Sequence, residues 1–256
     1  MDLLHILILV VAGVGGGIIS SLVGGAALVT YPALLSTGLP PVIATICNLV
    51  ALTPGNFLAA LYDRGQLPPL DRSFVGLVVA SLVGAFFGAT LLLLTPERLF
   101  AYFIPVLMAF ATVLFAYAGR ISTWMRARAA ARGKGTRNWG HSIGVLLPVS
   151  FYGGYFGAGV GVLILGVLSI GTGGDYRAAN TTKNLVTSLN SLVAAMLFVT
   201  RGAVQWQPTL IMMAGALIGS FIGARLAQIV PHTVMRIVVT VVGALLTAVF
   251  AWRYWL

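Results

Sequence analysis

The 256-residue chain carries very little charge. Asp, Glu, Lys and Arg make up 8% of it, and only five residues are acidic. Soluble proteins have about 25% charged residues, so water is excluded as the main solvent of this chain. Hydrophobic residues make up 59%, which is typical of a protein embedded in a lipid bilayer.

The few acidic residues also limit the function. They are Asp2, Asp63, Asp71, Glu97 and Asp175, and none falls in the middle of an apolar run. Carriers of protons or sodium often use buried carboxylates, so this distribution disfavours cation transport. Asp175 follows a Gly-rich turn and precedes a polar run, which predicts that it caps a helix.

Residues for catalysis, metal binding and disulfides are equally scarce. A single cysteine, Cys47, excludes an intramolecular disulfide. The three histidines are far apart, and no metalloprotease, nucleophile-elbow or P-loop motif occurs. We therefore expect no enzyme activity, no cofactor and no metal site. The N-terminus lacks the basic stretch of a signal peptide, so we expect the first apolar segment to be retained.

Apolar runs of about 20 residues, the length of a membrane-spanning helix, dominate the sequence. They cover residues 3–36, 41–62, 72–94, 97–119, 141–170, 178–200, 207–229 and 233–255. The first and the fifth are too long for one simple span, and both are rich in glycine. The sequence therefore predicts an all-α integral membrane protein with about seven or eight hydrophobic segments.

Glycine and asparagine recur in the two halves at a constant spacing of 136 residues. Examples are Gly17 and Gly153, Gly25 and Gly161, and Asn48 and Asn184. We predict two homologous membrane repeats, residues 1–119 and 141–256, joined by a basic linker at 120–140. Duplication of this kind is common in secondary transporters, whose substrate path lies between the repeats.

Each repeat opens with its Gly-rich segment, for which two explanations remain open. Glycines let neighbouring helices pack closely, or they break the segment into a discontinuous helix or a re-entrant hairpin that lines a substrate site. If each segment crosses the membrane once, the repeats run parallel. If each forms a hairpin, the repeats are inverted.

Basic residues bear on this choice, because the net charge of +10 is unevenly distributed. Six basic residues lie between Arg120 and Arg137, with no acidic residue among them. Basic loops between spans are usually cytoplasmic, so we predict a mobile cytoplasmic linker and no nucleic-acid partner. With the linker inside, parallel repeats put five of the fifteen basic residues outside, and inverted repeats put three. The count favours inverted repeats.

The run at 178–200 is the most polar, with Ser, Thr, Asn and Lys on adjoining faces of a helix. Because hydrocarbon cannot satisfy these groups, they either join helices by hydrogen bonds or line a polar cavity. A thinner polar stripe follows the run at 41–62, where Cys47 takes the place of Lys183. The predicted substrate-binding residues are Thr45, Asn48, Thr181, Lys183, Asn184, Ser188 and Asn190. Two of them, Asn48 and Asn184, could donate N–H bonds to an oxyanion from equivalent positions.

Arginines gather at two places that lie on one side of the membrane in either arrangement. Arg177 begins the sixth run, and Arg225 and Arg236 flank the turn at Pro231. We predict that they form a basic vestibule that attracts anions. The alternative is that they extend to lipid phosphates.

The chain resembles the sulfite exporter TauE/SafE family of membrane transporters over nearly its whole length. The resemblance rests on both Gly-rich openings, on the run from Gly24-Gly25 through Tyr31-Pro32-Ala33-Leu34 to Gly38, and on the Arg-Gly turns at Arg64-Gly65 and Arg201-Gly202. The sequence departs from the family pattern at Leu168, Cys47 and Lys183.

The resemblance implies a multi-pass protein of the cell inner (cytoplasmic) membrane that exports sulfite or a small organosulfonate. The expected partners are a small anion and the lipid bilayer, and the sequence does not indicate an oligomeric state. A protein of another class, a membrane channel or scaffold subunit without a substrate cycle, remains the alternative.

Overall fold

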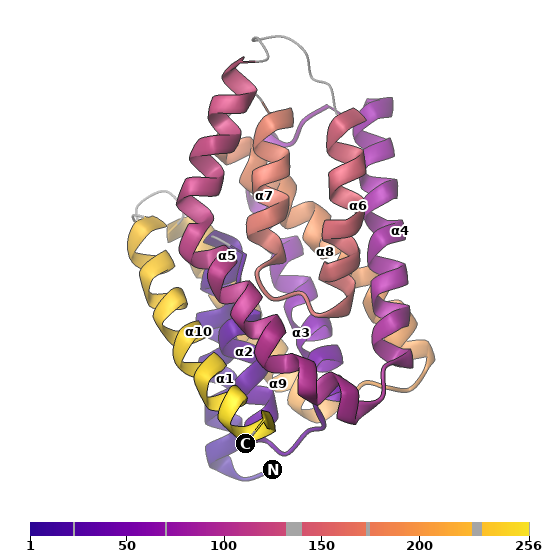
Figure 1. The fold of residues 1–256 in the computed structure, drawn as a ribbon, viewed down its shortest axis with the longest axis vertical. Helices are drawn as coiled ribbons and strands as arrows, with labels where there is room; N and C mark the ends of the chain where they lie inside the picture. Colours follow the sequence, from indigo (N-terminus) through magenta and orange to yellow (C-terminus); the bar gives the residue numbers. More distant parts are fainter. Residues whose placement is uncertain (23, 70, 132–139, 173–174, 227–231, 256) are drawn as a thin grey trace.

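The computed structural model is entirely helical over the residues that it describes, which are 1–22, 24–69, 71–131, 140–172, 175–226 and 232–255 (Figure 1). The first half contains α1 (Leu3–Leu22), α2 (Ala27–Ser36), α3 (Pro41–Tyr62), the 3-10 helix η1 (Arg64–Gln66), α4 (Arg72–Leu94) and α5 (Glu97–Ala131). The second half contains α6 (Gly140–Tyr155), α7 (Val160–Gly171), α8 (Tyr176–Thr200), α9 (Trp206–Leu226) and α10 (His232–Trp255).

Six helices of the described chain are long and apolar enough to cross a membrane. They are α1, α3, α4, α5 over Glu97–Tyr117, α8 and α9. The prediction of an all-α, multi-pass membrane protein is confirmed at this level. Helix starts follow local chemistry: the Asp175 carboxylate accepts hydrogen bonds from the backbone N–H groups of Arg177 and Ala178, as expected for a capping residue.

Both Gly-rich segments are divided into two helices. The first break separates Leu22 from Ala27, and the second separates Tyr155 from Val160. Helices α6 and α7 lie side by side and join at one end (Figure 1), and α1 and α2 also pack against each other. With 10 residues in α2 and 12 in α7, these two helices are shorter than the roughly 20 residues of a full span.

Glycines also bring neighbouring helices into close contact, as the packing interpretation predicted. Helix α1 packs on α9, where a Cβ atom added to Gly13 would lie 2.5 Å from the carbonyl oxygen of Met212. Helix α4 packs on α6, with Gly84 against the backbone of Leu147. Some glycines of these segments therefore serve helix packing, and others, such as Gly24 and Gly157, lie in the breaks.

The first part of the expected linker is helical, since α5 continues to Ala131. Alanine and arginine, which are frequent here, favour helices. Residues 132–139 lie outside the described chain, so the mobility of the linker stays a prediction. Both chain termini lie at one end of the molecule, and the C-terminal end of α5 lies at the other (Figure 1).

Candidate functional site

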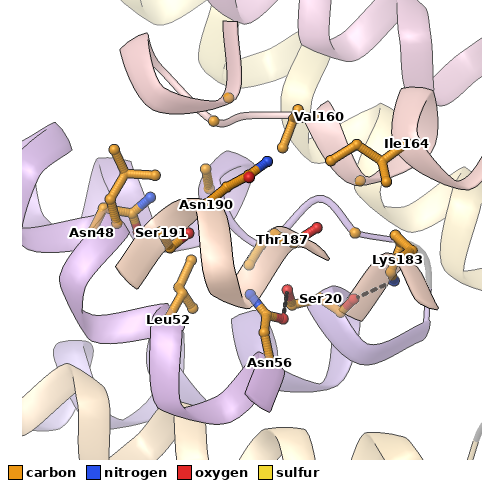
Figure 2. A pocket seen from close by; sticks show the side chains of 17 residues that line it. Ser20, Asn48, Leu52, Asn56, Val160, Ile164, Lys183, Thr187, Asn190 and Ser191 are labelled. Atoms are coloured by element: carbon orange, nitrogen blue, oxygen red, sulfur yellow. Dashed lines mark hydrogen bonds between the residues drawn. The ribbon is translucent and has the colours of Figure 1, made fainter. Parts of the chain in front are cut away.

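A small cavity with several polar side chains in its lining lies where both halves of the chain meet (Figure 2). Its lining comes from α1, α2, α3, α6, α7, α8 and the two breaks in the Gly-rich segments. The cavity offers about 40 Å³ to the centres of water molecules, and about 10–15 Å³ is enough for one. It therefore has room for a few waters or for one small oxyanion.

The two breaks cross at glycine beside this cavity. Gly24 has φ +85°, and a Cβ atom added to it would lie 2.6 Å from the Cα atom of Gly161. Gly157 and Gly159 in the second break also have positive φ values, 77° and 75°. Only glycine adopts these conformations readily and allows two backbones to touch in this way. The glycines thus bring backbone of both breaks to the wall of the cavity.

Lys183 is the one cation of the cavity lining, and its side chain is fully buried. Its Nζ donates a hydrogen bond of 2.9 Å to the carbonyl oxygen of Ser20 (Figure 2). Asn180 and Tyr176, also on α8, donate to the carbonyl oxygens of Ser21 and Leu22. These carbonyls end α1 and have no partner within that helix. Helix α8 therefore caps the negative end of α1 with a cation.

No carboxylate neutralises Lys183, because all five acidic residues are placed elsewhere in the described structure. Asp63 pairs with Arg177, Asp71 and Asp175 cap α4 and α8, Glu97 accepts from the N–H of Val42, and Asp2 lies near His5. An ammonium has three N–H donors, and Ser20 takes one. Burial without a counter-ion disfavours the charged form of the side chain, and an anion bound in the cavity would stabilise that form.

Asparagine amides add further donors. Ser20 Oγ donates to Asn56 Oδ1 at 2.6 Å, and Thr30 Oγ1 donates to Asn48 Oδ1 at 2.5 Å. Because both amide oxygens are engaged by hydroxyl donors, the NH₂ groups of these two cavity-lining residues can donate to a bound anion. Thr187 Oγ1 is buried without a hydrogen-bond partner in the described part of the chain. The cavity thus presents mainly donors, which suits an oxyanion.

Of the seven predicted binding residues, Asn48, Lys183 and Asn190 line the cavity. Asn190 is already engaged there, since its amide bonds Ser81 and Ser150. The other four, Thr45, Thr181, Asn184 and Ser188, are buried but do not belong to its lining. The hydroxyl groups of Thr45 and Thr181 donate to carbonyl oxygens of their own helices. The Ser188 hydroxyl donates to the carbonyl oxygen of Thr53 and so joins α8 to α3.

The predicted pairing of Asn48 with Asn184 is not symmetric in the structure. Asn48 accepts from Thr30, whereas the residue 136 positions later is Gly166, which has no hydroxyl. Asn184 Oδ1 is accordingly buried without a hydrogen-bond partner among the described residues.

Of the predicted vestibule, Arg177 and Arg225 do not line the cavity. Arg177 forms an ion pair with Asp63 at 2.7 Å, which joins the two halves at the molecular surface. The guanidinium of Arg225 lies 4.3 Å from the ring centre of Phe221. The side chain of Arg236 lies outside the part of the chain that the structure describes.

Ser20, Asn56, Thr187 and Ser191 line the cavity but were not among the predicted binding residues. Asn56 belonged to the polar stripe of the second apolar run, and Thr187 and Ser191 belonged to that of the sixth. Ser20 directly precedes the first glycine break, and its position there is the only signal that the sequence gives for it.

Curated relatives cover nearly the whole chain. A probable membrane transporter protein of Haemophilus influenzae is 26% identical over 97% of this chain and 94% of its own length. The probable membrane transporter protein YfcA of Escherichia coli K12 is 24% identical over 91% of this chain and 84% of its own length. The probable membrane transporter protein ORF9 of a Sinorhizobium species is 28% identical over 86% of this chain and 82% of its own length.

No solved structure shows a significant match to the chain. The sequence profile described as "Sulfite exporter TauE/SafE" matches residues 9–250. The relatives are named as probable membrane transporters, in agreement with a helical chain that is long and apolar enough to span a bilayer. The chain therefore belongs to the sulfite exporter TauE/SafE family of membrane transporters.

Proposed function

We propose that the protein is a secondary transporter that exports a small oxyanion, sulfite or a small organosulfonate, across the cytoplasmic membrane. The observation that carries this proposal is the buried ammonium of Lys183, which faces a small cavity and has no carboxylate partner among the described residues. A bound anion would supply the missing charge and accept from the amides of Asn48 and Asn56. The small volume favours sulfite over bulkier sulfonates.

We further propose that residues 1–119 and 141–256 are inverted repeats and that each Gly-rich segment is re-entrant. In support, corresponding helices make corresponding contacts: α1 packs on α9 as α6 packs on α4, while α3 meets α8 and α5 meets α10. The cavity lies between the halves, as substrate sites do in transporters built from repeats. Rocking of one repeat against the other would expose this cavity to each side in turn.

The orientation follows from the basic residues of segment 120–140, which we place in the cytoplasm. Inverted repeats then place Arg98, Arg201 and Arg253 outside the cell. The other basic residues lie inside. The predicted vestibule of Arg177, Arg225 and Arg236 would lie on the cytoplasmic side, where an exported anion enters.

Uptake of labelled sulfite by proteoliposomes tests the proposal. Lys183→Met keeps the length of the side chain and removes its charge, so we expect binding to weaken about 10- to 100-fold, the equivalent of one lost charge-assisted hydrogen bond. Asn56→Leu should weaken it less, because a neutral donor is lost.

Asn180→Leu is the matched control, since Asn180 caps the same end of α1 but does not line the cavity. This variant should keep the affinity of the unchanged protein. If Lys183→Met and Asn56→Leu fold and bind sulfite as tightly as Asn180→Leu does, the proposed site is refuted.

A further inference from the structure

A second cavity lies near the beginning of α5, at the end of the molecule that holds both termini (Figure 1). It is open and offers about 350 Å³ to the centres of water molecules. The α2–α3 connection, the beginning of α5 and the end of α10 form its walls. Arg98 and Arg253, one from each half of the chain, both line it.

Helix packing holds the two arginines at the same cavity. The indole N–H of Trp255 donates to the carbonyl oxygen of Tyr102 at 3.0 Å, which fastens the end of α10 to α5. The ring of Tyr254 stacks on Phe250, with ring centres 6.1 Å apart. The arginines are therefore attached to fixed backbone, although their side chains reach water.

The one carboxylate of this cavity is engaged by a helix. Glu97 Oε2 accepts a hydrogen bond of 2.9 Å from the N–H of Val42, in the first turn of α3. The positive end of a helix offsets part of such a charge. Within the described structure, no carboxylate lies in salt-bridge contact with Arg98 or Arg253. The cavity therefore has a net positive character.

Helix α2 connects this outer cavity with the central one. Ala27 lines the central cavity, Leu35 lines the outer one, and Tyr31 lies between them at helical spacings of four residues. Tyr31 is 1% exposed and packs against Phe156 and Phe250, with ring centres 5.6 and 6.3 Å away. The Tyr31 ring is therefore packed at a position of α2 that lies between the two cavities.

By the spacing of the repeats, the outer cavity corresponds to the predicted cytoplasmic vestibule in the other half of the chain. Pro41 and Glu97, which line the outer cavity, occupy the positions equivalent to Arg177 and His232. Because Pro41 is neutral and Glu97 is acidic, these two positions bring no positive charge to the first half. The structure supplies the charge from other positions, Arg98 and Arg253.

We infer that the outer cavity is a second binding site for the transported oxyanion, a vestibule on the face opposite the basic linker, and that Tyr31 is the barrier between it and the central site. This inference rests on the proposed function. Two guanidinium groups at one open cavity raise the local concentration of anions. The anion would pass along α2 from Lys183 to this vestibule when Tyr31 moves.

Exchange of labelled sulfite, measured separately on each face of oriented proteoliposomes, tests the vestibule. Arg98→Gln and Arg253→Gln should each raise the half-saturating sulfite concentration on the outer face by about two- to fivefold, the effect of one exposed charge. The linker face should be unaffected. Arg201→Gln is the matched control, because this exposed arginine follows α8 on the same proposed face but does not line the cavity.

Tyr31→Ala tests the barrier independently and should increase the rate of sulfite exchange, whereas Tyr31→Phe should keep the rate. If Arg98→Gln and Arg253→Gln match Arg201→Gln on both faces while sulfite is still transported, the vestibule is refuted and the central site stands. If the unchanged protein moves no sulfite, the proposed function fails, and this inference fails with it.

Discussion

Lys183 has two tasks at the scale of a single residue. Its ammonium caps the carbonyl of Ser20 and faces the cavity with its other N–H groups. A buried charge without a counter-ion is unfavourable, so an apolar side chain of similar length removes that cost. Loss of the hydrogen bond to Ser20 opposes that gain, so the two effects nearly offset each other.

We therefore predict that Lys183→Met changes the Tm of the empty protein by only a few degrees but removes the stabilisation by sulfite. The unchanged protein should gain about 2.7 kcal/mol at a sulfite concentration about 100 times the Kd. Thermal unfolding in detergent, with and without sulfite, measures both quantities. A sulfite-dependent rise in Tm that survives in Lys183→Met would show that the anion binds elsewhere.

A second prediction concerns the Thr30 hydroxyl, which fixes the amide of Asn48. Thr30→Val keeps the shape of the side chain and leaves a buried amide oxygen without its donor, at a cost of about 1–3 kcal/mol. Sulfite affinity should fall as well, because the amide is no longer held in one orientation. Thr112→Val is the control, since among the described residues the buried Thr112 hydroxyl bonds the carbonyl of Met108 in its own helix, as Thr30 bonds that of Ala26, but bonds no amide. Equal losses in the two variants would argue against a special role of Thr30.

At the scale of elements, the crossing of the two breaks requires residues without a side chain. A Cβ atom on Gly161 would lie 2.5 Å from the Cα of Gly24, and neither neighbour is a side chain that could move away. Gly24 also has a positive φ, and Gly161 does not. Substitution of Gly161 therefore tests the close contact alone, whereas substitution of Gly24 tests the contact together with the positive φ.

We predict that Gly24→Ala and Gly161→Ala both lower transport strongly and destabilise the protein. Gly202→Ala is the matched control, because Gly202 also has a positive φ, 65°, but a Cβ atom added to it would meet no atom within 4 Å, and it lines neither cavity. Backbone strain alone should cost about 1 kcal/mol and leave transport measurable. Transport rates and Tm values of the three variants decide the question: losses of the same size at Gly202 and Gly161 would refute the importance of the crossing.

At the scale of the whole molecule, the proposed orientation places the chain termini outside and the basic linker inside. In a Cys47→Ser background, Asp2→Cys should react with an impermeant maleimide added to intact cells. Thr136→Cys should react only after the cells are opened. The reverse labelling pattern would invert the topology and would exchange the faces assigned to the two vestibules.

The sequence predicted the helical class and the excess length of both Gly-rich segments, because apolar length and glycine content are local properties. It did not locate the breaks, since Gly13 and Gly17 lie within α1 and the first break follows Leu22. The site was predicted only in part. The face of α8 that meets the cavity depends on how α1 and α3 pack against it, so Thr187 was passed over while Thr181 was chosen. The contact of Lys183 with Ser20 joins residues 163 positions apart, and no local pattern reports a contact of that kind.

The exchange of Lys183 for Cys47 between equivalent positions has a consequence for the direction of transport. Two identical inverted halves would give inward-open and outward-open forms of equal energy. Lys183 makes the two energies unequal. It donates a hydrogen bond to the end of α1, and in the described structure no lysine does the same at the end of α6. The empty carrier would then rest with its opening toward one side, and the depth of that preference would be set by a single side chain.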